Sequence, residues 1–175
     1  AAASAIGDVI GGQSLNQALP PRLAQVADRD RAFLQQLCYG ALRDAPKLFA
    51  VLDLLLQKPL RERDADLRGL LLAGLHQLES MRVPDHAAVA STVSACAALK
   101  KHWARGLVNA VLRRYLREQA ALDAKIACVR AEAELASLVV TLGSQELDQL
   151  PRRHPVGRAG VEPRRGPEPL VDRRF

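Results

Sequence analysis

The chain has 175 residues, of which 49% are hydrophobic and 3% aromatic, and its formal net charge is +6. This length suggests one domain with a tail, and a composition rich in leucine and alanine favours packed helices over a β-sheet. The cysteines are widely spaced and form no CxxC pair, which excludes a zinc ribbon and a disulfide framework and fits a reducing cytoplasm.

Neither a membrane span nor a signal peptide is indicated. The most apolar run, LFAVLDLLL at residues 48–56, is short and contains Asp53, so it cannot cross a bilayer. The initial AAASAIGDVIGG has no basic region and carries Asp8, unlike a signal peptide. We therefore expect a cytoplasmic protein without membrane contact, and the basic surplus favours polyanionic partners.

The first hundred residues predict a series of helices separated by residues typical of helix ends. A double glycine can end the first helix, a double proline can end a short second one, and Asp28 can cap the third. Gly74 lies inside an apolar helical stripe, where it costs about 1 kcal/mol relative to alanine, so we expect a neighbouring helix to approach closely there. The predicted helices cover residues 1–10, 14–20, 28–44, 48–56, 67–81 and 85–100.

The next helix contains the most informative stretch, KKHWARGLVNAVLRRYLRE at residues 100–118. Apolar residues recur in it at helical spacing, whereas no acid follows its bases until Glu118. At 100° per residue, bases and one asparagine form a row beside the apolar arc. The row consists of Arg105, Asn109, Arg113 and Arg117.

This pattern allows two interpretations. One is the solvated face of a core helix, which is the common origin of a run of charges. The other is a nucleic-acid-binding face, favoured because the bases lack the i, i+4 ion pairs that a merely soluble helix would use. Lys100 and Lys101 also precede the helix, where its first amides can join them at a phosphate.

Some single residues also allow two roles each. We expect His76, in the middle of its helix, to be packed or half-exposed, with a ligand role as the alternative. We expect His86 to serve the turn before it, with RNA contact as the alternative. We expect Trp103 at the edge of the core, with base stacking as the alternative. Asn109 can bond another helix's backbone or a nucleotide. No catalytic or metal-binding pattern has a convincing context.

The composition changes near residue 137. The segment LVVTLGSQELDQLPRRHPVGRAGVEPRRGPEPLVDRRF holds five prolines, four glycines and seven arginines, and shows no sustained period beyond LVVTL. Such a segment cannot bury enough apolar surface to offset its ordering entropy. We expect a folded domain over residues 1–137 and a disordered tail over residues 138–175. The abrupt change also suggests a truncation or a shifted reading frame.

Three stretches carry a family resemblance: DRDRAFLQQLCYGALRD, LRGLLLAGLHQLESMRVPDHAAVASTV and KKHWARGLVNAVLRRYLRE. Their most specific parts are R-x-P-D-H-A-A-V-A and, about twenty residues later, G-L-V-N-A-V-L-R. They resemble the NusB-like domain, and most closely the N-terminal domain of bacterial 16S rRNA cytosine-C5 methyltransferases of the Sun/Fmu type. The resemblance covers about residues 1–130. It implies an all-α, NusB-like helical bundle that binds RNA.

The sequence departs from that family in three respects. It begins after a basic residue usual near the first helix, and Ser91 stands where an acid is common. The methyltransferases continue into a domain with a glycine-rich site for S-adenosylmethionine and two catalytic cysteines, one after proline. Neither feature occurs here. We therefore expect no catalysis, no cofactor and no metal.

The sequence thus predicts an RNA-recognition module of an rRNA methyltransferase without its catalytic domain, with 16S rRNA as the partner. The alternatives are a free-standing transcription antitermination factor and a helical protein-interaction module. Phosphate contacts would position the RNA. The residues expected to bind it are Lys100, Lys101, Arg105, Asn109, Arg113, Arg114, Arg117, Arg29 and Arg43.

Overall fold

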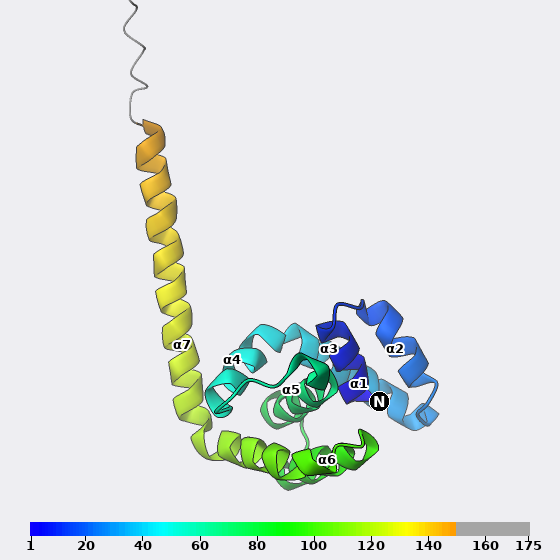
Figure 1. The fold of residues 1–175 in the computed structure, drawn as a ribbon. Helices are drawn as coiled ribbons and strands as arrows, with labels where there is room; N and C mark the ends of the chain where they lie inside the picture. Colours follow the sequence, from blue (N-terminus) through cyan, green and yellow to red (C-terminus); the bar gives the residue numbers. More distant parts are fainter. Residues whose placement is uncertain (150–175) are drawn as a thin grey trace, which may run out of the picture. The chain divides into compact units, whose positions relative to one another are not determined.

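The protein is all-α, as the sequence predicts (Figure 1). The computed structural model describes residues 1–149, with side chains up to Val129 and at Ala131, and this part contains no strand. Two short 3₁₀ turns, η1 and η2, precede α5 and α7. The elements are α1 (Ala2–Ile10), α2 (Leu15–Leu23), α3 (Asp28–Arg43), α4 (Ala45–Leu55), η1 (Glu62–Asp64), α5 (Ala65–Ser80), α6 (Asp85–Ala98), η2 (His102–Ala104) and α7 (Arg105–Gln149).

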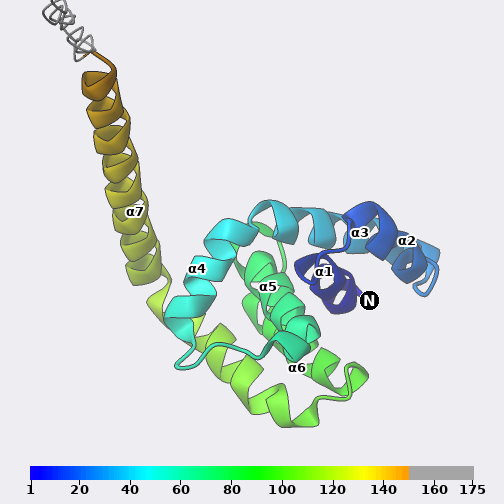
Figure 2. The same cartoon turned by 45° about the horizontal axis from the view of Figure 1, so that its top comes forward.

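Helix α5 is the centre of the bundle. In both views it lies among α1, α3, α4 and α6, and it contacts each of them (Figures 1 and 2). Its residues from Gly69 to Gln77 are buried without interruption. A helix that is apolar on nearly all sides must be enclosed by others, which explains its central place.

Glycines allow helices α1 and α5 to cross closely. A Cβ on Gly69 would lie 2.8 Å from the backbone nitrogen of Gly7, and a Cβ on Gly7 would lie 2.9 Å from Cα of Asp66. These neighbours are backbone atoms and cannot move aside. The sequence Ala3 to Gly7 therefore packs directly against the first turns of α5.

The expected close approach at Gly74 is confirmed. A Cβ there would lie 2.9 Å from Cγ2 of Thr92 on α6 and 3.2 Å from Cδ2 of Leu112 on α7. Leu112 is fully buried, and so are Val108 and Tyr115 on the same face of α7. The apolar arc of the basic stretch therefore lies in the core, as predicted.

Several predicted helix ends differ from the structure. Helix α4 begins at Ala45 and not at residue 48, and Asp28 is the first residue of α3 and not its cap. The prolines at positions 20 and 21 lie inside α2, which continues to Leu23. They leave the carbonyl groups of Asn16 and Gln17 without helical donors, but both residues are exposed, so water can bond these groups.

Helix α7 also exceeds the predicted boundary. It continues to Gln149, so residues 138–149, which we placed in a disordered tail, are helical. Alanine, glutamate and leucine are frequent in its later turns, and no proline follows its start before Pro151. The rest of the expected tail, residues 150–175, lies outside the described residues. Residues 1–133 form one compact unit.

Candidate nucleic-acid interface

A groove of about 480 Å³ lies between α6 and α7 and contains part of the predicted row. Arg105, Asn109 and Arg113 line it from α7, and His86 lines it from the first turn of α6. The Nε of Arg113 donates a hydrogen bond of 2.9 Å to Oδ1 of Asn109, which orients the guanidinium along the helix. Asn109 therefore accepts a bond within its own helix instead of bonding another helix's backbone, and its contact with a nucleotide stays a prediction.

The arginines of the row present unpaired charge. Arg105, Arg113 and Arg117 are exposed, and within residues 1–129 none of them forms an ion pair. Asp85 lines the same groove and is its one acidic residue among those described. The α6–α7 face, which we define as Arg105, Asn109, Arg113 and Arg117, therefore carries a clear positive excess.

Lys101 has partners that the sequence did not predict. Its ammonium group lies 2.6 Å from Oδ1 of Asp64 and 2.6 Å from Oδ1 of Asp66, and its side chain is 15% exposed. Burial lowers the pKa of Lys101, but its bonds to both carboxylates outweigh burial and raise that pKa overall. The bond from Lys101 in turn lowers the pKa of Asp64. Because two carboxylates already neutralise this charge, Lys101 does not belong to the α6–α7 face.

Lys100 shapes the chain between α6 and α7. It adopts a left-handed conformation with φ of 56° and is exposed. Its N–H donates to the carbonyl of Ala97, and the N–H of Lys101 donates to the carbonyl of Cys96. This pair of bonds is the usual closure of a helix by a left-handed residue. Lys100 thus ends α6 and leaves its ammonium group toward solvent.

The remaining predicted arginines lie elsewhere. Arg114 donates to the carbonyl of Leu55 at 3.2 Å, and its Nε lies 3.0 Å from Glu118. Since Leu55 is the last residue of α4, Arg114 caps that helix, where a cation is favourable. Arg29 and Arg43 are exposed on α3, and each contacts the aspartate that follows it in the chain.

A second basic cavity, which the sequence reasoning missed, lies on the other flank of α7. It measures about 850 Å³ and is bounded by the α4–α5 connection and by α7. The expectation of a packed Trp103 is wrong, because this indole is 65% exposed and lines the cavity. The sequence feature that could have indicated this cavity is the run KPLRERD at residues 58–64. Its basic residues stand in the connection between two helices. The cavity's basic residues are Lys58, Arg61, Arg63 and Arg114.

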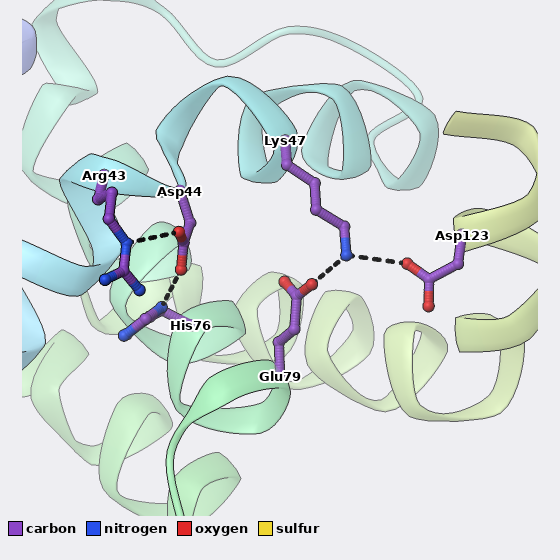
Figure 3. A network of polar contacts seen from close by, with 6 residues as sticks. All are labelled: Arg43, Asp44, Lys47, His76, Glu79 and Asp123. Atoms are coloured by element: carbon purple, nitrogen blue, oxygen red, sulfur yellow. Dashed lines mark hydrogen bonds and ion pairs between the residues drawn. The ribbon is translucent and has the colours of Figure 1, made fainter. Parts of the chain in front are cut away.

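A partly buried network of charges joins α4, α5 and α7 (Figure 3). Lys47 on α4 bonds Glu79 on α5, and its Nζ lies 3.2 Å from Oδ1 of Asp123 on α7. Beside it, Nδ1 of His76 lies 3.1 Å from Oδ2 of Asp44. Burial lowers the pKa of His76 although Asp44 opposes this. The groups in this network hold helices together, which confirms a packed role for His76.

Burial raises the pKa of the Cys38 thiol to about 11, so this group stays protonated at neutral pH. No cluster of histidine, cysteine and carboxylate side chains in this part of the chain could hold a metal ion. Nor does the described part contain a helix of the length and apolarity that a membrane crossing requires.

Comparison with known proteins gives a consistent relationship. A sequence model of the NusB family matches residues 1–117. Proteins named ribosomal RNA small subunit methyltransferase B are similar over the same region. The one from Vibrio cholerae is 48% identical over 126 residues, which are 71% of this chain and 29% of that protein. The one from Pseudomonas putida is 50% identical over 119 residues, 67% of this chain and 27% of that protein. The chain thus spans under a third of the length of these relatives.

Proposed function

The chain belongs to the NusB family, and we propose that its helical bundle is an RNA-binding module that recognises small-subunit ribosomal RNA. The observation that carries the proposal is the α6–α7 face. Its three arginines are exposed and form no ion pair with a described residue. All three stand on α7, whose opposite side is fully buried.

The rigid support of this face favours recognition of a structured RNA. Val108, Leu112 and Tyr115 fix α7 in the core, so its arginines are held at successive turns of one helix. Helical turns repeat every 5.4 Å or so, which sets the spacing of these arginines along α7. Phosphate contacts of this kind position a duplex without reading its sequence. Specificity would then depend on shape and on unpaired nucleotides.

The methyl transfer named for the relatives is a property of those whole proteins. We propose that this region supplies substrate recognition for such a reaction. The reaction itself needs a site for the methyl donor and a catalytic nucleophile. Neither Cys38 nor Cys96 is suited to that role, because both thiols are buried and burial raises the pKa of each.

Binding to RNA tests the proposal against a simpler explanation. The test compares the affinities of the full chain and of a free peptide covering residues 100–118 for a fragment of small-subunit rRNA. We expect the chain to bind more tightly, because folding preorganises its arginines. Equal affinities would show that charge alone attracts the RNA. In that case the α6–α7 face would be a solvated surface, and a role in protein interaction would be favoured.

A further inference from the structure

We propose that the cavity between the α4–α5 connection and α7 binds unpaired RNA nucleotides, with one base stacked on Trp103 and the flanking phosphates held by Lys58, Arg61 and Arg63. This inference rests on the proposed function and adds a second, chemically different site to it. The volume of about 850 Å³ lies within the range of ligand-binding cavities.

The floor of the cavity suits a base. Leu55, Leu107 and Val111 line it with apolar surface, and the Trp103 indole stands exposed at its edge. The exposed indole presents a flat apolar face that a ligand with a similar face can cover. Nucleobases have such faces, and they stack on aromatic side chains whatever their sequence.

The rim of the cavity suits phosphates. Lys58, Arg61 and Arg63 are exposed and form no ion pair with any described residue. The acid that lines the cavity, Asp64, is already bonded to Lys101. Arg114 is likewise paired with Glu118. Three exposed basic side chains without an ion pair to a described residue therefore surround an apolar floor, which matches a short stretch of single strand.

The loop that carries these bases is held in place at three points. Arg114 of α7 donates to the carbonyl of Leu55 at 3.2 Å, and Arg68 of α5 donates to the carbonyl of Leu60 at 3.0 Å. Lys101 fixes Asp64 at the end of the loop. Because both ends and the middle are anchored, the site is preorganised, and binding orders few groups.

The two basic surfaces adjoin one another on α7. At 100° per residue, Gly106 falls among the residues of the α6–α7 face, and Ala110 on the next turn lines the cavity. Both residues are exposed. A Cβ on Gly106 would meet nothing within 4 Å. A single RNA can therefore place a duplex on the α6–α7 face and pass an unpaired strand over these small residues into the cavity.

Trp103 reports on this site directly, because the chain contains one tryptophan. Tryptophan emission of the full chain is followed during titration with a ten-nucleotide single-stranded oligoadenylate. We expect saturable quenching. An abasic oligonucleotide of the same length should bind more weakly and quench little, and a polyglutamate peptide should not quench. Equal quenching by the peptide would overturn base recognition in favour of a general site for polyanions.

Substitutions separate the base from the phosphates. With labelled oligoadenylate, Trp103→Ala should raise Kd by about 5-fold or more, whereas Trp103→Phe should keep most of the affinity. Arg61→Ala should weaken binding and reduce the slope of log K against log salt by about 0.7. Arg31→Ala removes an exposed arginine from α3 that is not among the predicted RNA-binding residues, and it should change Kd and the salt slope less. Circular dichroism of each variant shows that the fold is retained.

Two failures are distinguishable. If RNA binds and responds to Arg113→Ala, but the oligoadenylate does not quench the emission of the wild type and its Kd is unchanged by Trp103→Ala and Arg61→Ala, the cavity is not a nucleotide site and the proposed function stands. If neither the oligoadenylate nor a duplex fragment of small-subunit rRNA binds, the proposed function fails and this inference fails with it.

Discussion

The ammonium group of Lys101 lies 2.6 Å from a carboxylate oxygen of Asp64, and both side chains are largely buried. The contact joins the start of α5 to the segment before α7. In the sequence, Lys101 is one of two adjacent lysines, and only its three-dimensional surroundings distinguish it from exposed Lys100. One lysine therefore stabilises the fold while its neighbour faces solvent.

The first prediction concerns this contact. Lys101→Ala should lower the free energy of unfolding by about 1.5–3 kcal/mol, because it leaves two partly buried carboxylates without their partner. Lys100→Ala is the matched control and should cost much less. Chemical denaturation of the three proteins measures the difference. Equal stabilities would mean that the Lys101 contacts contribute nothing net to folding.

The second prediction concerns the crossing of α1 and α5. Gly69→Ala should destabilise the protein by about 1–3 kcal/mol or more, since the added methyl group would overlap backbone atoms of Ala3 and Gly7. Gly106→Ala adds the same group where nothing lies within 4 Å, and it should be neutral or stabilising by up to about 1 kcal/mol. Thermal melts check both. A Gly69→Ala variant that melts like the wild type would contradict the close crossing of α1 and α5.

The third prediction concerns pH and His76. Burial lowers the pKa of this imidazole in the folded state, although Asp44 and Glu79 oppose burial and Arg43 adds to it. As the pH falls below the ordinary value of 6.5, the unfolded chain therefore binds a proton before the folded one does. Stability should fall with pH in that range, by at most about 1.4 kcal/mol per pH unit for one proton.

Denaturation of the wild type and of His76→Gln between pH 5 and 7 tests this linkage. The variant should show a shallower decline, whatever its stability at pH 7. Parallel curves for the two proteins would assign the pH dependence to other groups.

The fourth prediction concerns the buried side of the basic helix. Leu112→Ala should destabilise the fold by about 2–5 kcal/mol, because Leu112 is fully buried against Gly74 of α5. Arg113→Ala, one residue away, should change stability by no more than about 0.5 kcal/mol. A similar loss from both variants in denaturant would show that Arg113 also supports the fold.

The sequence was sufficient for the helical bundle and for the buried arc of α7, because both follow from the spacing of apolar residues. Gly74 was also predictable, since a glycine inside an apolar stripe has few explanations other than close packing. These features depend on local patterns, and the matched family agrees with them.

The distribution of charge was less predictable. Lys101 and Arg114 looked equivalent to Arg113 because a helical wheel does not show which acids or carbonyl groups other segments bring near. Asp64 and Leu55 are the partners, and both are far away in the sequence. The exposure of Trp103 was predicted wrongly for a related reason. A helical wheel does not fix the direction of a side chain that precedes the helix. The end of α7 was misjudged because later prolines dominated the composition of the segment.

The most direct test of the central claim is the salt dependence of RNA affinity for the wild type, Arg113→Ala and Lys101→Ala, measured with one duplex fragment of small-subunit rRNA. If about four basic side chains of the protein contact phosphates, the wild-type slope of log K against log salt should be about −3. Arg113→Ala should reduce that slope by just under one unit, and Lys101→Ala should leave it unchanged. Equal slopes for the wild type and Arg113→Ala would contradict the assignment of the α6–α7 face to RNA.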